Sequence, residues 1–389
     1  MSRAPRLVYL VTVPVTADAF LRGQLAFMRE RGFEVTVISS PGPELDRVAE
    51  RERVRTVAVP MARPIRPRED AISLARLLPV LRSVEPDIVN ASTPKAALLG
   101  MLASRTLRVP VRIYLMRGLR LETTSGNLRR VLSATERITA ACAHTVVCNS
   151  GSLREAAVAG GHIPAAKARL VGEGSSNGVE ADRWTRTPER VAEGRRRLAE
   201  HGITDGDEVI GFVGRFDPDK GIGDLLEAFT RVRARRPRAK LLLVGGGFAD
   251  DLDRTIAARV RSTPGVIDFG KSHDLAPLYA RMDVLAFPSL REGFPNAPLE
   301  AASAEVPAVG YRSTGVVDAI ADGESGTIVA RGDARALGDA LERYLADDTL
   351  RAAHARGARA RILRSFARER VWEAWERFYR TELASRTSR

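Results

Sequence analysis

The chain has 389 residues, 44% hydrophobic and 28% charged, so its length predicts two folded domains and its composition excludes an intrinsically disordered protein. Its net charge is +13, and residues 1–180 carry +10 of this, with 26 basic against 16 acidic residues. A basic half can attract nucleic acid, anionic lipid or a phosphorylated substrate, but only five of the 61 basic residues are Lys, so a general preference for Arg explains the charge as well.

The start of the chain bears on where the protein is located. The apolar run 7–13 follows two arginines, as in a signal peptide, but it is Val-rich, about seven residues long and ends at Pro14, which favours a buried first strand. No window approaches the roughly 18 apolar residues of a membrane span. Cys142 and Cys148 lack redox or zinc-site spacing, so we expect buried thiols in a reducing, cytoplasmic compartment.

Short β-type runs alternate with longer amphipathic stretches along the whole chain. In the first half we expect strands at 7–13, 34–39, 88–90, 111–115 and 145–148, and helices at 19–31, 72–84, 95–107 and 127–143. In the second half we expect strands at 209–213, 240–244, 266–269, 284–287 and 308–310, and helices at 222–235, 250–262, 273–281 and 298–304. This alternation predicts an α/β protein with two doubly wound, Rossmann-like domains, whose parallel sheets face a deep cleft.

The domain boundaries follow from breaks in the pattern. Residues 172–186 are rich in Gly, Ser and Asn and lack periodicity, so we place the crossing between the domains there. The domains are expected at 1–175 and 176–366, with a C-terminal helix, about 367–389, that crosses back to the first domain. That helix carries four aromatic side chains on one face and its neighbour, which predicts a packing surface: Trp372, Trp375, Phe378 and Tyr379.

The first motif with chemical content is GRFDPDKG, residues 214–221, directly after an expected strand. Gly214 and Gly221 permit tight turning and close backbone approach. Arg215 offers a planar fork and Lys220 a compact cation, and two cations at a strand end suit a diphosphate. A surface turn with solvated charges is the alternative.

The second motif is EGFPNAPLE, residues 292–300. Asn296 is the expected N-cap of a helix with Pro298 in its first turn, so free N–H groups would face an anion. Glu292 lies in the loop before this helix and Glu300 in its first turn, and carboxylates hydrogen-bond well to the vicinal hydroxyls of a sugar or ribose. Glu300 could instead be only a favourable first-turn acid.

The two motifs, in this order and some 70 residues apart, resemble those of the retaining glycosyltransferases of family 4, which have the GT-B fold. The stretches TPKAALLG, RGLRLE, GEGSSNGVEADRW and VIDFGKSHDLAPLYARMDVLAFPS extend the resemblance over nearly the whole chain. These stretches resemble those of family members that act in polysaccharide or glycolipid assembly. The resemblance implies an N-terminal acceptor domain and a C-terminal domain for a nucleotide diphosphate sugar.

The resemblance also implies roles for single residues. Arg215 and Lys220 would grip the donor diphosphate, Glu292 would contact the transferred sugar, and Glu300 would bind the ribose hydroxyls. Backbone groups of the loop between the acids would hold phosphate and sugar: Gly293, Phe294, Pro295, Asn296 and Ala297. Seven further residues would line the nucleotide pocket: Gly214, Gly245, Gly246, Gly247, Lys271, Ser272 and His273.

This chain departs from the family in two places. Many relatives carry a Gly-Gly pair in the first loop, whereas the loop here reads VPVTADAFLRGQ, in which Thr16 is our candidate substrate contact. Many relatives also have His where this chain has Arg117. Because Arg cannot act as a base at neutral pH, we expect Arg117 to stabilise phosphate or orient the sugar.

The implied mechanism is a front-face substitution in which the leaving phosphate takes the acceptor's proton. Asp250, Asp251 and Asp253 read as the acidic first turn of a helix, so we expect no metal and no cofactor. Alternatives are a sugar-nucleotide epimerase of the same fold, a pyridoxal-dependent phosphorylase, for which the chain is short, and a carbohydrate- or nucleic-acid-binding module. A Rossmann oxidoreductase fails because the first strand is not followed by G-x-G-x-x-G, and no nucleic-acid motif appears.

Family frequency favours a UDP-hexose or UDP-N-acetylhexosamine donor. The acceptor would be a glycan, a lipid-linked sugar or a small molecule. Arg63, Arg66 and Arg68 lie in a Pro-rich segment that could face anionic lipid at the inner side of the membrane, or could simply be a solvated loop.

Overall fold

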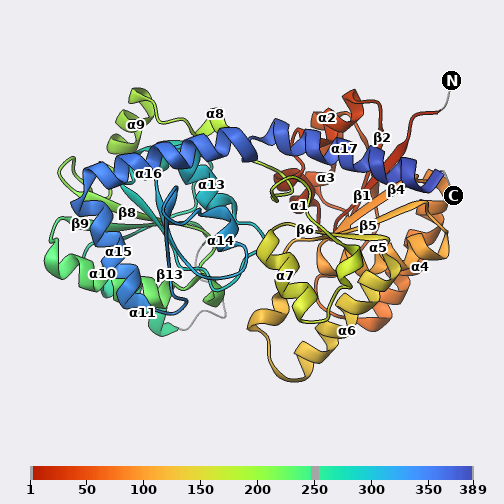
Figure 1. The fold of residues 1–389 in the computed structure, drawn as a ribbon, viewed down its shortest axis with the longest axis horizontal. Coiled ribbons are helices and arrows are strands. Elements are labelled where there is room, and N and C mark those ends of the chain that lie inside the picture. The colour runs from red at the N-terminus through yellow and green to blue at the C-terminus, as the bar shows by residue number, and fades with distance from the viewer. Residues whose placement is uncertain (1–2, 247–253, 388–389) are drawn as a thin grey trace. The chain divides into compact units, whose positions relative to one another are not determined.

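The computed structural model describes residues 3–246 and 254–387 (Figure 1). The chain divides into two compact units: unit 1 comprises Met1–Gly178 with Glu369–Arg389, and unit 2 comprises Val179–Arg368. The sequence had placed these boundaries at 175 and 366. Gly247, Asp250, Asp251 and Asp253, for which we predicted roles, lie outside the described residues.

Unit 1 is built on a seven-stranded parallel sheet of order β3-β2-β1-β4-β5-β6-β7. Its strands are β1 (Arg6–Leu10), β2 (Glu34–Ser39), β3 (Arg55–Ala58), β4 (Ile88–Ser92), β5 (Val111–Met116), β6 (Thr145–Cys148) and β7 (Ala168–Arg169). Its helices are α1 (Pro14–Phe20), α2 (Gln24–Glu30), α3 (Pro43–Glu52), α4 (Pro67–Val84), α5 (Pro94–Thr106), α6 (Gly126–Cys142), α7 (Gly151–Ala159) and α17 (Arg368–Thr387), with the short turns η1 (Arg120–Thr123) and η2 (Ala165–Lys167). Helix α17 joins this unit from Glu369 onward.

Unit 2 repeats the plan with a six-stranded parallel sheet of order β10-β9-β8-β11-β12-β13. Its strands are β8 (Glu208–Val213), β9 (Ala239–Val244), β10 (Val266–Gly270), β11 (Val284–Phe287), β12 (Ala308–Tyr311) and β13 (Gly326–Val329). Its helices are α8 (Ala181–Trp184), α9 (Pro188–Ala199), α10 (Ile222–Arg235), α11 (Arg254–Ser262), α12 (Ala276–Arg281), α13 (Asn296–Ser303), α14 (Val316–Ala319), α15 (Ala334–Ala346) and α16 (Asp348–Arg361), with the turns η3 (Pro218–Lys220) and η4 (Ile362–Phe366).

The strand order of each sheet reverses at one place, which positions the site. In unit 1 the reversal lies between β1 and β4, and in unit 2 between β8 and β11. In open parallel sheets the loops that follow the strands on either side of such a point diverge and leave a crevice at their carboxyl ends. The motif that follows β8 and the motif that follows β11 therefore meet at the crevice of unit 2.

The expected helix 19–31 is wrong, because the chain forms two helices there, and the expected first loop is helical. Pro14 starts α1, as its fixed φ allows at a first helical turn, and the break comes before α2. Gly23, with φ of +77°, lies at the break, and a Cβ there would be 2.7 Å from the Trp372 ring. The buried carboxylate of Glu52 accepts hydrogen bonds from the amides of Gly23 and Ala26, which stabilises the start of α2.

Some elements escaped prediction or differ in length. Helix α4 begins at Pro67, before the expected residue 72, and α12 begins at Ala276, after the expected residue 273. Strands β3, β7 and β13 and several helices, α3, α7, α8, α9, α14, α15 and α16, were not anticipated. The missed strands have at most four residues and, unlike the equally short β6 and β11, they are not buried along their whole length, so they lack a continuous apolar run.

The C-terminal helix packs into unit 1, as expected from its aromatic residues. Trp375 and Tyr379 are 1% and 0% exposed and lie in the cluster that also contains Leu7 and Tyr9 of β1. Tyr379 accepts a hydrogen bond of 2.6 Å from the side-chain amide of Asn90 in β4. The predicted packing surface is therefore confirmed.

Both cysteines are buried free thiols, as expected. Burial raises the pKa of Cys148 to about 12, so this thiol stays protonated at neutral pH. Within the described residues, no helix is both long enough and apolar enough to cross a membrane.

Candidate functional site

Lys220 and Glu292, from the two sequence motifs, form an ion pair in unit 2. Lys220 ends the short turn η3 after β8, and Glu292 lies in the loop after β11. Each side chain is only 15% exposed. The pair therefore joins the two motifs at the carboxyl edge of the sheet, at the crevice between β8 and β11.

Glu292 is held by further contacts. The Ser289 hydroxyl donates a hydrogen bond of 2.8 Å to its carboxylate, and the Glu292 amide donates to the carbonyl of Thr314. Ser289 itself is 1% exposed, and its carbonyl accepts a hydrogen bond of 2.6 Å from Ser313. Glu292 is thus fixed by both backbone and side chain, and its carboxylate faces a cation.

Arg215 behaves differently from Lys220. It follows β8 at the same sheet edge, its side chain is 76% exposed, and it pairs with Asp217 at 2.5 Å. An exposed ion pair of this kind contributes little to stability, so the guanidinium can exchange Asp217 for another anion at small cost. The structure thus places Arg215 beside Lys220 in the motif but does not bring it onto Glu292.

The motif glycines are required by close backbone contacts. Gly221 has φ of +68°, and a Cβ there would lie 2.2 Å from the carbonyl oxygen of Pro288 after β11. A Cβ at Gly245 would lie 1.8 Å from the carbonyl oxygen of Gly214. Only residues without a side chain allow the loops after β8, β9 and β11 to approach this closely.

Glu300 lies on helix α13 and is hydrogen-bonded by a residue of another helix. The hydroxyl of Tyr279, on α12 and fully buried, donates to the Glu300 carboxylate at 2.9 Å. Loss of solvent around the carboxylate raises the pKa of Glu300, and the Tyr279 hydrogen bond opposes that shift. One carboxylate oxygen is thereby occupied, which orients the other.

The structure corrects two details of this helix. Pro295, rather than Asn296, occupies the N-cap position, and Asn296 is the first helical residue. Counting from there, Glu300 lies in the second turn, so it is neither a first-turn residue nor an acid placed to favour the helix dipole.

The backbone before α13 can receive an anion. Among the residues that the structure describes, the amides of Gly293 and Phe294 donate to no acceptor. The first N–H groups of α13, including those of Asn296 and Ala297, lack intrahelical partners by geometry. The Phe294 side chain points elsewhere: it is 9% exposed and packs against Phe366 with ring centroids 5.1 Å apart. Only the backbone of Phe294 is available to a ligand.

The expected nucleotide-facing residues lie at the ends of β9 and β10. The Gly245 amide donates to the Gly270 carbonyl, and Gly246 lies under the aliphatic stem of Lys271, whose Cε is 3.5 Å from a Cβ built on that glycine. Lys271 and His273 are exposed, whereas the Ser272 hydroxyl donates to the carbonyl of Asp274. The structure brings Gly245, Gly246 and Lys271 together, and Ser272 has a structural partner.

Arg117 belongs to unit 1, where it directly follows β5. Its Nη1 donates to the Ser176 hydroxyl at 2.7 Å and to Asn177 at 3.2 Å, and the guanidinium lies over the Phe20 ring. Its Nε and Nη2 are buried without a partner among the described residues. Burial lowers the pKa of Arg117 to about 10, so it remains a cation at neutral pH.

Asn149 lies nearby, after the neighbouring strand β6, and its side-chain oxygen is also buried without a partner within the part of the chain described. Its backbone N–H donates to the carbonyl of Met116, the residue before Arg117. Buried polar groups that lack partners are rare in folded proteins, and each needs an explanation, such as a water molecule, an ion or a catalytic role. Thr16, by contrast, is buried in α1 with 8% exposure.

Sequence reasoning missed Ser289, Tyr279, Asn149 and Ser176. Ser289 is three residues before Glu292, between the predicted strand 284–287 and the second motif, so its spacing was a usable signal. Tyr279 gave none, because it precedes Glu300 by 21 residues and lies on a different helix.

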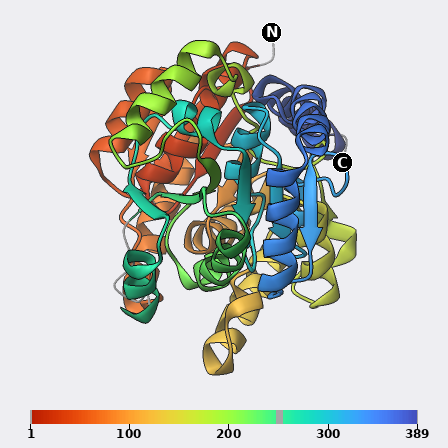
Figure 2. The same ribbon diagram turned by 90° about the vertical axis from the view of Figure 1, so that its left-hand side faces the viewer.

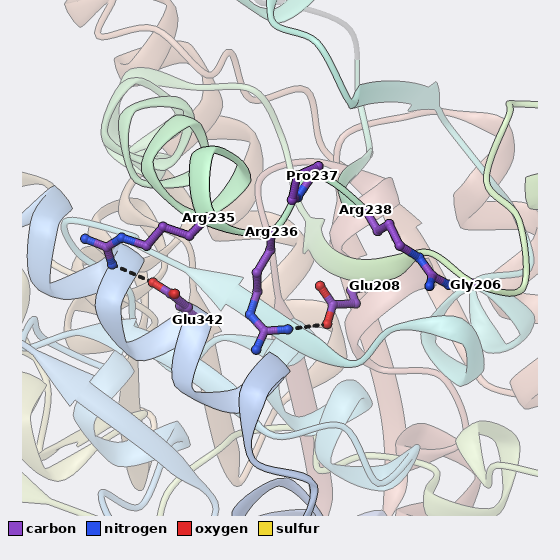
Figure 3. A pocket seen from close by; sticks show the side chains of 7 residues that line it. All are labelled: Gly206, Glu208, Arg235, Arg236, Pro237, Arg238 and Glu342. Atoms are coloured by element: carbon purple, nitrogen blue, oxygen red, sulfur yellow. Dashed lines mark hydrogen bonds and ion pairs between the residues drawn. The ribbon is translucent and has the colours of Figure 1, made fainter.

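Figure 3 shows a hollow of about 550 Å³ in unit 2 that is not this site. It is lined by Arg235, Arg236 and Arg238 at the amino ends of β8 and β9, the opposite edge of the sheet from the motifs. Two of its arginines are neutralised: Arg235 pairs with Glu342 and Arg236 with Glu208.

Comparison with known proteins identifies the family. Residues 207–347 match the family model described as glycosyl transferases group 1, and residues 17–174 match the one described as glycosyl transferase 4-like domain. The chain is 32% identical over 379 residues to the capsular polysaccharide biosynthesis glycosyltransferase CapM of Staphylococcus aureus, and the match covers 97% of each chain.

Two solved structures show the same fold. Anabaena HepE in complex with UDP and glucose aligns over 97% of this chain and 100% of its own, with a TM-score of 0.80 and 18% identity. WaaG, a glycosyltransferase involved in lipopolysaccharide biosynthesis, aligns over 95% and 98%, with a TM-score of 0.70 and 18% identity. From the matching family models, the CapM similarity over the whole length and the two parallel Rossmann-like units, we conclude that this chain belongs to the group 1 glycosyltransferases and has the GT-B fold.

Proposed function

We propose that this glycosyltransferase moves a hexose or N-acetylhexosamine from a UDP-linked donor to a lipid-linked or glycan acceptor, with retention of anomeric configuration, in the assembly of a cell-surface polysaccharide. The main support is the contact of Lys220 and Ser289 with Glu292 at the sheet crevice of unit 2. The similarity to CapM supports the polysaccharide pathway, and that to HepE, solved with UDP and glucose, supports the donor.

In the proposed donor complex, phosphate oxygens replace Glu292 as the partner of Lys220. Arg215 leaves Asp217 for the same diphosphate, and the amides of Gly293 and Phe294 add neutral donors. Released from Lys220, Glu292 accepts hydrogen bonds from the sugar hydroxyls. Glu300 binds the ribose diol through the oxygen that Tyr279 leaves available.

The proposed reaction needs no protein nucleophile. The bond from the anomeric carbon to the diphosphate oxygen breaks, and the acceptor oxygen bonds to that carbon on the same face. The acceptor's proton passes to the departing phosphate oxygen. Catalysis then depends on stabilising the negative charge of that phosphate, the task of Lys220 and Arg215.

Arg117 is proposed to stabilise phosphate or orient the sugar through its Nε and Nη2, which are buried and have no partner among the described residues. Replacing Arg117 with Ala should lower turnover far more than donor affinity. Turnover and donor KM, measured together, check this role, and unchanged turnover would reject it.

We also propose that the reaction needs no metal ion, because two cations and a helix N-terminus supply the positive charge. Turnover should survive dialysis against EDTA. Loss of activity with EDTA and its recovery with magnesium would show that the cations are insufficient.

One experiment tests the donor and the class of reaction. A thermal-shift panel of UDP, GDP, ADP and TDP sugars should show stabilisation by UDP sugars. The active donor is then incubated with acceptor, and NMR of the product should show the anomeric configuration of the donor. Inversion would contradict retention, and nucleotide release that is complete without any acceptor would favour the epimerase alternative.

A further inference from the structure

Large apolar side chains exposed to solvent gather in unit 1. Of the eight such side chains among the described residues, seven belong to unit 1 and three to helix α6. The three are Leu128, Val131 and Ile138, with exposed fractions of 42%, 45% and 46%. Residues 126–131 are all exposed, and Figure 2 shows the amber start of this helix projecting from its unit.

The same helix carries a row of positive charge. Arg130 and Arg137 are seven residues apart and share one face, which lies about 100° around the axis from the face of Val131 and Ile138. A hollow of about 750 Å³ along α6 is lined by Arg129, Arg130 and Arg137 together with Ile138.

Nothing on α6 offsets this charge. Its single acidic residue, Glu136, is buried and accepts a hydrogen bond of 2.7 Å from Tyr114. Arg129 and Arg130 have no ion-pair partner within the described ranges, and Arg137 donates only to the backbone carbonyl of Gly161. The exposed faces of the helix therefore combine aliphatic side chains with uncompensated arginines.

We infer that the exposed side of α6, Leu128 to Ile138, docks on the surface of an anionic lipid membrane. Aliphatic side chains next to uncompensated arginines suit the boundary between headgroups and acyl chains. Nucleic acid would use the arginines but gain nothing from Leu128, Val131 and Ile138, since single strands bind on aromatic rings. The inference rests on the proposed function, because an enzyme that acts on a lipid-linked acceptor works at such a surface.

The test is co-sedimentation of the full-length protein with two kinds of vesicle. One consists of phosphatidylcholine alone, and the other also contains phosphatidylglycerol, an anionic lipid, at about one-third of the total. Wild-type protein should bind the anionic vesicles, and binding should weaken as salt rises. The double variant Leu128→Ser/Val131→Ser should weaken binding by about tenfold. Arg130→Gln and Arg137→Gln should each weaken it by about fivefold.

Two exposed apolar positions elsewhere serve as matched controls. Leu363→Ser, in unit 2, and Ile72→Ser, on α4, change side chains that are 46% and 52% exposed and should leave vesicle binding unaltered. The inference is overturned if wild-type protein fails to bind anionic vesicles, or if the α6 variants bind like wild type. It is also overturned if Ile72→Ser has the effect expected of α6, or if light scattering shows a dimer that the α6 variants abolish.

Thermal stabilisation by the UDP sugar separates this inference from the proposed function. Every α6 variant should be stabilised by the UDP sugar as much as the wild type, because none of the proposed donor residues lies on α6. Membrane binding without stabilisation by any UDP sugar would contradict only the proposed function, and stabilisation without membrane binding would contradict only the role of α6.

Discussion

Replacing Tyr279 with Phe removes one hydroxyl and tests whether that tyrosine orients Glu300. The hydroxyl donates at 2.9 Å to the Glu300 carboxylate from a fully buried ring, and the ring itself is retained by its edge contact with Trp184. A hydrogen bond to a charged group contributes about 1.5–3 kcal/mol. At about 1.4 kcal/mol per factor of ten, the KM for the donor should rise roughly 10- to 100-fold while kcat changes little.

The same substitution should shift the pH dependence of donor binding. Burial already raises the pKa of Glu300, and the Tyr279 hydrogen bond holds it down. Without that bond the pKa rises further, so the ionised carboxylate, and with it donor affinity, is lost at a higher pH as the solution is acidified.

The assay is the donor KM across pH 5 to 9 for the wild type and the variant. Tyr344→Phe is the matched control, because Tyr344 is also fully buried in unit 2 but contacts Thr327 and His354. An unchanged donor KM and pH profile in Tyr279→Phe would refute the reasoning, as would an equal change in Tyr344→Phe.

Three further predictions follow from single contacts. Lys220→Met should lower kcat/KM about 100- to 1000-fold in steady-state assays, because the leaving phosphate loses its buried cation; a loss below fivefold would contradict that role. Gly221→Ala should lower the free energy of unfolding, measured in urea, by about 2–4 kcal/mol, because its Cβ would clash with the Pro288 carbonyl at a positive φ. The control Gly223→Ala, whose Cβ contacts only Ile256 at 3.8 Å, should leave the free energy of unfolding unchanged or raise it. Burial raises the pKa of Glu136 to about 7 from 4.5, so its contribution to stability is complete below pH 4.5 and is lost as pH rises through 7. Glu136→Gln should remove this pH-dependent loss of stability, which amounts to about 3 kcal/mol. The check is thermal unfolding of both proteins across this pH range, and a stability that falls equally with pH in the two would contradict the prediction.

The sequence predicted the central strands well because these strands are buried on both faces, whereas the edge strands β3, β7 and β13 were missed. Continuous apolar runs such as Val284–Phe287 leave little ambiguity, and this strand matches its predicted bounds. The first helix was misjudged because its break depends on tertiary contacts. Gly23 packs against Trp372, which lies 349 positions later in the chain. No local sequence pattern predicts that contact.

The site was only partly readable. Lys220 and Glu292 were identified from their motifs, and the structure shows them in contact. The groups that position the acids were not all visible, since Tyr279 reaches Glu300 from another helix and the buried atoms of Arg117 and Asn149 gain meaning only from their surroundings. The N-cap was misassigned by one residue because Pro295 already has the extended backbone of a capping position.

The route of the chain has a consequence for synthesis on the ribosome. Trp375 and Tyr379 complete the core around Leu7 and Tyr9, yet they are translated more than 360 residues after them. Unit 2 is one continuous segment, so it can fold as soon as it is synthesised, whereas unit 1 remains incomplete until its last helix has been translated. A nascent chain released before residue 369 would leave the core around Leu7 and Tyr9 without Trp375 and Tyr379, and the apolar surface exposed in this way would favour aggregation.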